Sequence, residues 1–251
     1  MYKIPANTLF LGKNLVYVPQ CHSTNTLATE LSQKADTPEG TLIITNHQIA
    51  GRGQRGSSWE AAPGENLTFS LILKPTFLQA QNQFQLNQAF SLGVLDYVKG
   101  KLDTDIKVKW PNDVMVNERK VCGILFENQI SGNELRHSIV GIGLNVNQQS
   151  FQYPTAGSLR LFSHQTYSLA PELEALLQHL ESRYLMLKEG KHEKLKTEYL
   201  QHLYRLGEMH RFDNHEMEFD GIISGVDEVG RLRIEVDGVE RIFGAKQLIF
   251  L

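Results

Sequence analysis

The sequence predicts an α/β protein, in which a mixed β-sheet covered by helices is followed by a small C-terminal β-barrel. Up to about residue 205, segments with apolar residues at helical spacing alternate with short apolar segments typical of buried strands. From Glu208 onward the pattern changes to short strands with alternating polar and apolar residues. The chain has 251 residues and 41% hydrophobic content, enough for a large domain and a small one. We therefore divide it into residues 1–205 and 206–251.

The large domain is predicted to begin with a strand near residues 15–18 and a helix that opens at Ser23, Thr24 and Asn25, whose side chains are natural N-caps. A longer helix with regularly spaced apolar residues would cover one face of the sheet. Residues 139–145 are expected at the centre of the sheet, where their glycines let a ligand or a neighbouring backbone come close. Further strands are expected at residues 41–45, 67–73 and within 106–147, and helices at residues 84–99, 171–187 and 191–206.

The small domain is predicted from strands that alternate polar and apolar residues towards the C-terminus. Asp227-Glu228-Val229-Gly230 and Asp237-Gly238 separate these strands and are typical of hairpin turns. About 45 residues with this pattern favour a small barrel. The strands are expected at residues 216–220, 222–223, 231–236 and 240–243.

Composition argues against several classes of function. The formal net charge of −3 argues against a duplex-binding surface, because such surfaces neutralise phosphates. No apolar run approaches the roughly 18 residues of a membrane span, and the N-terminus lacks the apolar core of a signal peptide. Cys21 and Cys122 are too few for a disulfide framework, and no Cys or His pair has zinc-ligand spacing. We therefore expect a cytoplasmic protein with no nucleic-acid, membrane or zinc partner.

The most informative segment is a glycine-rich loop that carries two arginines and ends in a tryptophan. Glycines let backbone N–H groups approach an anion closely, and guanidinium groups add charge-assisted hydrogen bonds. The loop formally fits the G-x-G-x-x-G dinucleotide fingerprint, but no helical period follows it, and the next strand runs into Lys74 and Pro75 instead of an acidic residue. A loop that binds phosphate and a flat base is favoured, and a surface loop with solvated arginines is the alternative. The segment reads Gly51-Arg52-Gly53-Gln54-Arg55-Gly56-Ser57-Ser58-Trp59.

A second polar cluster lies in the hairpins that follow the longer helix. Pro111 cannot donate to a β-ladder, so a strand should end there and leave Asn112 and Asp113 where the strand gives way to a turn. The turn at residues 117–119 then returns the chain and brings Lys120 near both side chains. Taken singly, Asp113 could be an ordinary turn aspartate and Lys120 an ordinary edge lysine.

Together, these segments resemble the biotin protein ligases. The resemblance runs from about Tyr17 to Asn147 and implies a catalytic domain like those of class II aminoacyl-tRNA synthetases and biotin ligases, with an SH3-like domain after it. Some members carry an N-terminal DNA-binding domain; here the resemblance begins before residue 20, and we expect a short form without it. The blocks in matching order and spacing are Ser23-Thr24-Asn25, Gln48 with residues 51–56 and Trp59, Lys109-Trp110-Pro111-Asn112-Asp113, Arg119-Lys120 with Gly123-Ile124-Leu125, and Gly141-Ile142-Gly143-Leu144-Asn145-Val146-Asn147.

The resemblance implies a two-step activity. Biotin and ATP would form biotinyl-5'-AMP, and the biotinyl group would pass to a lysine of a biotin carboxyl carrier protein domain. Three residues are then the catalytic candidates: Arg52 to hold carboxylate and phosphate, Lys120 to contact the reacting oxygens, and Asp113 to position Mg²⁺ or the amine. The candidates for binding biotin and its adenylate are Ser23, Thr24, Asn25, Gln48, Gly51, Arg52, Gly53, Gln54, Lys120, Gly123, Gly141 and Gly143.

The same resemblance assigns the nucleotide contacts. Trp59 would stack on adenine and Asn112 would bond its edge; a packed aromatic and a turn asparagine are the structural alternatives. Ser23 and Thr24 could likewise be no more than helix caps. Some family members carry arginine at position 54, so Gln54 leaves one fewer cation around the adenylate. The nucleotide-binding candidates are Arg55, Trp59, Asn112 and Asn145.

Two other functions remain open at this point. A lipoate or octanoate protein ligase or transferase of the same superfamily could use Cys122 as an acyl-carrying nucleophile. Cys122 lies in an apolar strand without a base nearby in the sequence, which favours a buried structural thiol. A biotin-responsive repressor is disfavoured, because a helix-turn-helix would need residues ahead of the resemblance. The resemblance allows a homodimer through sheet edges, and nothing in the sequence specifies the interface or the acceptor protein.

Overall fold

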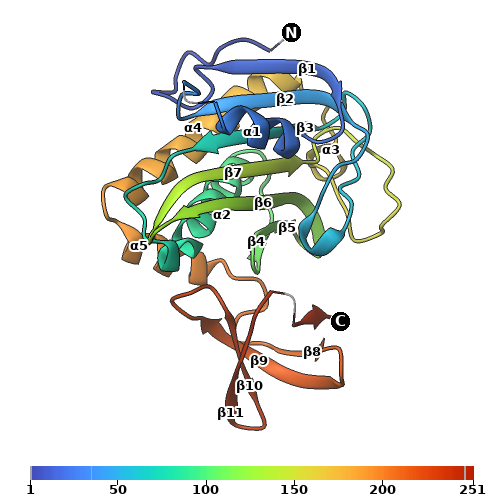
Figure 1. Cartoon of the computed structure of the whole chain (residues 1–251). Helices are drawn as coiled ribbons and strands as arrows, with labels where there is room; N and C mark the ends of the chain where they lie inside the picture. The colour runs from blue at the N-terminus through green and yellow to red at the C-terminus, as the bar shows by residue number, and fades with distance from the viewer. Residues whose placement is uncertain (1, 35, 246) are drawn as a thin grey trace.

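The computed structural model describes residues 2–34, 36–245 and 247–251, and only the backbone of Arg55. Its larger part is a mixed sheet with helices on both faces, and its smaller part is a five-stranded antiparallel sheet (Figure 1). This confirms the predicted fold class. No helix of the described residues combines the length and hydropathy needed to cross a bilayer.

The larger sheet places its predicted central strand in the middle. Strands β1 and β2 run parallel, and every other neighbouring pair is antiparallel. Strand β7 pairs with β3 on one side and β6 on the other, so residues 139–144 lie at the centre, as expected. In spatial order the strands are β1 (Leu15–Cys21), β2 (Thr41–Gln48), β3 (Leu67–Leu73), β7 (Glu134–Leu144), β6 (Arg119–Ser131), β5 (Asp113–Val116) and β4 (Ile106–Lys109).

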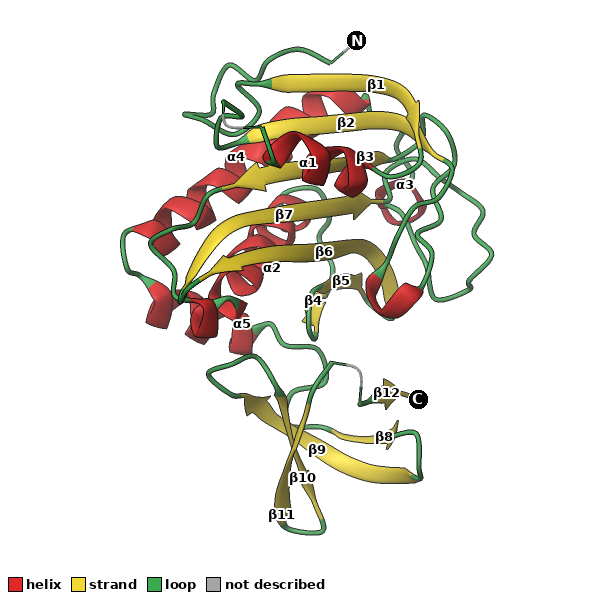
Figure 2. Cartoon of the chain, viewed as in Figure 1, coloured by secondary structure: helices red, strands yellow, loops and turns green. Residues whose placement is uncertain are grey.

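Helices cover the two faces of this sheet unequally (Figure 2). Helix α1 (Thr24–Ser32) packs on one face, where Ala28 contacts a small apolar cluster from β2, β3 and β7. Helix α2 (Phe84–Lys99) lies on the opposite face and packs against α4 (Leu169–Lys188) and α5 (His192–Gln201) over the main core. Strand β3 is buried along its whole length because both of its faces are covered.

The predicted helix at residues 191–206 ends early, at Gln201. The residues after it pair with the edge strand β4 instead: the Val108 N–H donates to the His202 carbonyl, and the Tyr204 N–H donates to the Val108 carbonyl. Residues 202–206 therefore have apolar residues at helical spacing but form a strand-like contact with β4. Their sequence alone does not predict this contact. The contact covers an edge that would otherwise present unpaired backbone groups.

The smaller sheet contains two strands that the sequence pattern did not single out, β8 (Met209–Asp213) and β12 (Ile249–Phe250). Two predicted strands, at residues 216–220 and 222–223, are one continuous strand, β9 (Glu218–Val226). Both predicted turns are present, with Asp237 and Gly238 at positive φ as a tight hairpin requires. Strands β10 (Leu232–Val236) and β11 (Val239–Phe243) complete the order β11-β10-β9-β8-β12.

The two sheets meet through a few defined contacts. The Trp110 indole N–H donates to the Gly230 carbonyl at 2.9 Å, and a Cβ built on Gly230 would lie 2.4 Å from the Phe84 ring. The segment after α5 also bridges to Ile223 of β9. Trp110 follows β4 and Phe84 opens α2, so the turn of the small sheet rests on the same elements that border the larger sheet.

Candidate active site

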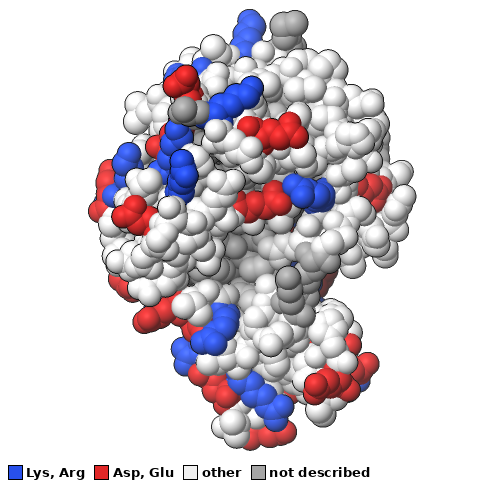
Figure 3. Space-filling view, viewed as in Figure 1, with Lys and Arg blue, Asp and Glu red and all other residues white. Residues whose placement is uncertain are grey.

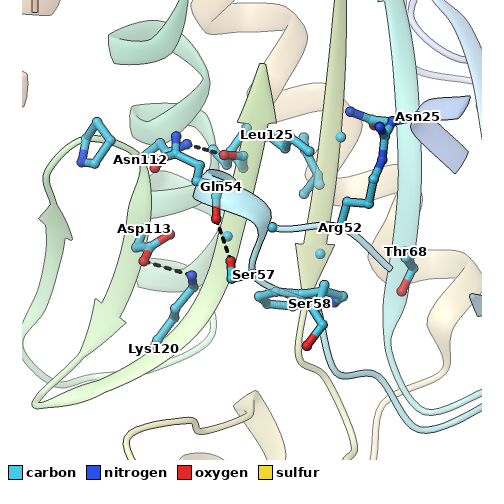
Figure 4. A pocket seen from close by; sticks show the side chains of 18 of the residues that line it. Asn25, Arg52, Gln54, Ser57, Ser58, Thr68, Asn112, Asp113, Lys120 and Leu125 are labelled. Carbon is cyan, nitrogen blue, oxygen red and sulfur yellow. Dashed lines mark hydrogen bonds and ion pairs between the residues drawn. The ribbon is translucent and has the colours of Figure 1, made fainter. Parts of the chain in front are cut away.

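A cavity of about 380 Å³ lies on the face of the larger sheet that carries α1. Its walls come from the N-terminus of α1, the loop after β2, the β4–β5 turn and the C-terminal strand β12. Most of the residues singled out from the sequence line it (Figure 4). They are Ser23, Thr24, Asn25, Gln48, Arg52, Gly53, Gln54, Trp59, Asn112, Asp113, Lys120, Gly123, Gly141 and Gly143.

The floor of the cavity is a row of residues across neighbouring strands. Gly123 of β6 pairs with Asp113 of β5 on one side and with Gly143 of β7 on the other, and Gly143 pairs with Thr68 of β3. The two central positions have no side chain, and the ring of Trp59 lies on them. A Cβ on Gly143 would lie 2.3 Å from the indole, and one on Gly123 would lie 3.0 Å from it. Glycine is required here by close approach, as expected for the strand 139–145.

Trp59 therefore covers the floor of the cavity. Its indole nitrogen is buried without a hydrogen-bond partner among the described residues. Burying an indole N–H without an acceptor is unfavourable, so packing on the glycines, and not a hydrogen bond, holds the ring here. The Lys120 ammonium lies 5.4 Å from the centroid of the ring.

At the α1 end of the cavity, hydrogen bonds fix the predicted biotin-binding side chains. Gln48 Oε1 accepts from the Thr24 backbone N–H at 2.7 Å and from its hydroxyl at 3.1 Å. The Ser70 hydroxyl lies 2.7 Å from Thr24 Oγ1 and 2.6 Å from Asn25 Oδ1. Ser23 sits at the N-cap of α1, but its side chain makes no capping bond. The helix-cap alternative for Ser23 and Thr24 is therefore not supported by these contacts.

Arg52 and Glu127 form an ion pair at the rim. Arg52 Nη2 lies 3.2 Å from Glu127 Oε2, and Asn25 Nδ2 donates to the same carboxylate oxygen at 2.7 Å. Arg52 also pairs with Ser58 in a short antiparallel bridge that closes the loop. Residues 54–56 form a single 3₁₀ turn rather than the start of an α-helix, which confirms that the loop is not a dinucleotide fingerprint.

On the opposite wall, Lys120 and Asp113 form the pair that the predicted hairpin implied. Lys120 Nζ lies 2.8 Å from Asp113 Oδ2, both side chains about one-third exposed. A second cation, Lys109, also lines the cavity, and burial lowers the pKa of its ammonium. Its ammonium lies 4.8 Å from the centroid of the Phe250 ring in β12. Positive charge thus comes from Arg52 on one side and from two lysines on the other.

Two predicted site residues, Gly51 and Asn145, are not among the residues that line this cavity. Gly51 lies just behind it, where a Cβ would lie 2.7 Å from the Trp59 carbonyl oxygen. The Asn145 amide donates to the Gly157 carbonyl at 2.9 Å, and its Oδ1 is buried without a partner among the described residues. The side chain of Arg55 lies outside the described residues. Asn112 does line the cavity, but its amide donates to the Ile124 carbonyl.

Cys122 is fully buried, and burial raises the pKa of its thiol. A thiol without access to solvent and with a raised pKa is not a nucleophile, so the structure disfavours the acyl-carrying alternative. Among the described residues, no group of three or more His, Cys, Asp or Glu could hold a metal ion.

Sequence reasoning missed several lining residues. Thr68, Lys109 and Leu125 lie in apolar or strand-like segments, and their place in the site follows from strand register alone. Leu248 and the two residues of β12 come from the other end of the chain. Glu127, which contacts Arg52, lies four residues after Gly123 in the same strand. Because side chains in a strand alternate between the two faces of the sheet, Gly123 and Glu127 share a face, and this spacing could have placed Glu127 on the cavity side.

Comparisons with known proteins find relatives of this chain in sequence and in structure. Residues 17–145 match the Biotin/lipoate A/B protein ligase family. The chain is 31% identical over 244 residues to the bifunctional ligase/repressor BirA of Bacillus spizizenii, covering 95% of this chain and 74% of that protein. It is 28% identical to the biotin–[acetyl-CoA-carboxylase] ligase of Mycobacterium tuberculosis, over 95% of this chain and 90% of the relative.

Among solved structures, the biotin protein ligase from Aquifex aeolicus in complex with biotin and ATP superimposes with a TM-score of 0.79 at 26% identity. The match covers 95% of this chain and all of that one. The matched family segment runs from β1 to the end of β7 and contains the glycine-rich loop, the Lys120–Asp113 pair and the glycine floor. The chain belongs to the biotin/lipoate A/B protein ligase family.

Proposed function

We propose that this protein is a biotin protein ligase, which activates biotin with ATP and transfers the biotinyl group to a carrier-domain lysine. One observation carries the proposal: two opposed sources of positive charge and the indole of Trp59 converge on a single cavity of about 380 Å³. A carboxylate and a triphosphate repel each other, so a site that joins them must gather cations around both. The comparisons support biotin as the acid, because the Mycobacterium tuberculosis relative and the Aquifex aeolicus complex are biotin ligases.

In the first step the biotin carboxylate oxygen attacks the α-phosphorus of ATP, and the bond to the pyrophosphate leaving group breaks. Arg52 on the loop and Lys120 on β6 approach the cavity from opposite walls. Arg52 would hold the carboxylate and phosphate with the loop N–H groups, and Lys120 would stabilise charge that develops on the reacting oxygens. Ser23, Thr24 and Gln48 would bond the ureido ring, at the end of the cavity where hydrogen bonds already join Thr24 to Gln48.

The nucleotide would occupy the part of the cavity that Trp59 covers. Moving the indole off the glycine floor would let it stack on adenine and would free its N–H for an acceptor. Asn112 would present its amide oxygen to the adenine edge, while one N–H of its nitrogen donates to the Ile124 carbonyl. Asp113 is a single carboxylate beside the cavity, which fits Mg²⁺ bound mainly by phosphates, and this ion would neutralise phosphate charge.

In the second step a lysine amine attacks the acyl carbon of biotinyl-5'-AMP, AMP leaves, and the amine loses a proton. Asp113 would position that amine once pyrophosphate has left. The acceptor would be a biotin carboxyl carrier protein domain.

We also propose that the protein works in the cytoplasm, binds no nucleic acid, and divides into a catalytic domain at residues 1–205 and an SH3-like domain at 206–251. A homodimer through sheet edges remains an open proposal.

The test is transfer to a carrier domain. The protein is incubated with ATP, Mg²⁺ and a biotin-free carrier domain, with biotin, lipoate or octanoate as the acid, and the carrier mass is measured. A carrier with its acceptor lysine replaced by arginine is the control. We expect the mass of one biotinyl group on the native carrier and none on the control. Modification by lipoate or octanoate but not by biotin would favour the alternative enzyme of the same superfamily.

A further inference from the structure

The loop of residues 51–58 has a cavity on each of its two sides. On one side lies the cavity of the proposed active site, and on the other lies an open cavity of about 540 Å³ between the loop, β6 and Ala245. Arg52, Gly53 and Gln54 line both. Side chains of this loop therefore have little packing behind them, and its position depends on the contacts that tie it to the sheet.

Hydrogen bonds within the loop fix its internal shape, but they do not fix its position relative to the sheet. The Gly53 N–H donates to the Ser57 carbonyl at 2.7 Å, and the Trp59 N–H donates to the Gly51 carbonyl at 2.9 Å. These bonds close a small hairpin, which could still swing as a unit. The Arg52–Glu127 ion pair is the contact that joins the guanidinium of this hairpin to strand β6.

Glu127 is itself held from a third element. Asn25 Nδ2 donates to the carboxylate oxygen that Arg52 contacts, and Asn25 Oδ1 lies 2.6 Å from the Ser70 hydroxyl. Asn25 is also fixed sterically, since a Cβ on Gly141 would lie 2.2 Å from its Oδ1. The predicted biotin-binding residue Asn25 thus has both ends of its amide engaged by the protein, and one of them orients Glu127.

We propose that Glu127 is a positioning residue: fixed by Asn25, it holds Arg52 and the arginine-bearing loop over the cavity before substrate arrives. This inference rests on the proposed function, since it assigns Arg52 to the carboxylate and phosphate. One nitrogen of the guanidinium contacts Glu127, which leaves its other donors for those anions. Glu127 is not a ligand for the substrates, because its carboxylate would repel both of them.

The charge of Glu127 could have acted in the opposite sense, by competing with the substrate anions for Arg52. Two features argue against competition. The contact uses a single nitrogen at 3.2 Å rather than a bidentate pair, and the two side chains are 47% and 35% exposed. A half-exposed, single-contact ion pair adds little to stability and is a weak competitor, but it restricts where a long side chain lies.

The first experiment asks whether the tether exists, without any substrate. Proteolysis within a folded protein follows local opening, so trypsin cleavage after Arg52 and Arg55 measures opening of the loop. Glu127→Gln keeps the size and an acceptor for Asn25 and removes the charge, and Glu134→Gln makes the same change at an exposed site on β7. We expect loop cleavage of the ligand-free protein to rise roughly two- to fivefold in E127Q, with unchanged global melting, and not in E134Q. Equal cleavage rates in E127Q and the wild type would overturn the tether.

The second experiment asks whether the tether acts through Arg52 in adenylation. Single-turnover formation of biotinyl-5'-AMP is measured in the wild type, E127Q, R52A and the double variant. We expect E127Q to slow the wild type roughly tenfold, within the usual coupling of contacting residues, and to change R52A less than about twofold. A tenfold loss in both backgrounds would show that Glu127 acts independently of Arg52 and would overturn the proposal. No adenylate from the wild type would overturn the proposed function and this catalytic role with it, while the trypsin comparison still decides the tether.

Discussion

At the scale of single residues, the glycines of β6 and β7 explain why this cavity exists. Gly123 and Gly143 are paired neighbours, and the indole of Trp59 occupies the space that two side chains would fill. The sequence predicted a close approach at residues 139–145, because glycine in a strand interior is unfavourable unless something needs the space. It could not predict that the approaching group is an aromatic ring of the chain itself, since that depends on a loop some 80 residues earlier in the sequence.

Trp59→Ala should weaken ATP or adenylate binding by about 1–3 kcal/mol, because stacking of a base on an aromatic ring contributes that much. Biotin binding on its own should hardly change, since the hydrogen bonds around Gln48 and Thr24 lie at the other end of the cavity. Titration calorimetry with each ligand separates the two effects. Equal losses for both ligands, or a lower melting temperature with normal nucleotide binding, would mean that Trp59 only packs on the floor.

Lys120→Ala should separate chemistry from binding. Removing one preorganised donor at a developing charge lowers the rate by roughly a hundred- to a thousandfold. Biotin affinity should change less, because Arg52 and the α1 hydrogen bonds remain. The measurement is single-turnover adenylation, with biotin affinity and circular dichroism on the same preparation. Lys107→Ala, which removes a lysine paired with Asp105 outside the cavity, is the matched control. Adenylation of Lys120→Ala within about threefold of wild type would exclude Lys120 from the mechanism.

At the scale of elements, local pattern predicted most of the large domain. The strand at residues 67–73 and the helix at 84–99 have the predicted bounds, because each carries a long uninterrupted period. The elements that were missed or cut short depend on partners elsewhere in the chain. The two-residue strand β12 exists only because β8 pairs with it, and helix α5 ends where β4 captures the following residues. The local sequence pattern does not predict pairings between segments that lie far apart in the chain.

Helix α4 also anchors the N-terminal segment through a buried carboxylate. Glu181 is 5% exposed and accepts three backbone N–H bonds, from Leu9 at 2.6 Å, Phe10 at 2.8 Å and Leu11 at 2.9 Å. Glu181→Gln would turn an N–H towards one of these donors, so we expect the free energy of unfolding to fall by about 1–3 kcal/mol. Denaturant melts measure it, with Glu193→Gln on the surface of α5 as control. Equal free energies of unfolding for the two variants would show that the three hydrogen bonds stabilise the protein no more than burial of the Glu181 charge destabilises it.

At the scale of the whole molecule, the face that Figure 3 shows carries charges of both signs. Lysine and arginine side chains are interspersed with aspartate and glutamate, and uncharged residues cover much of the rest of that face. The formal net charge is −3. We therefore predict no salt-sensitive, sequence-specific duplex binding, with or without biotin and ATP. A gel-shift assay checks this, and saturable nanomolar binding to one sequence but not to a scrambled one would contradict it.

Segments far apart in the sequence meet at the cavity. Residues near Ser23 and residues 248–250 line the same space, and one continuous core joins the two sheets. The sequence predicted two domains, and the boundary at residue 205 stays a prediction. That the small sheet supplies part of the cavity wall could not be predicted, because β12 is too short to carry a pattern and its place follows from tertiary contacts alone.

The central claim is that this cavity joins biotin to the α-phosphate of ATP, and pyrophosphate exchange into ATP measures that step without an acceptor protein. Radiolabelled pyrophosphate is supplied with ATP, Mg²⁺ and either biotin, lipoate or octanoate. We expect exchange that depends on biotin, is absent without an acid, and falls with Lys120→Ala. Exchange with lipoate or octanoate but not with biotin would contradict the account.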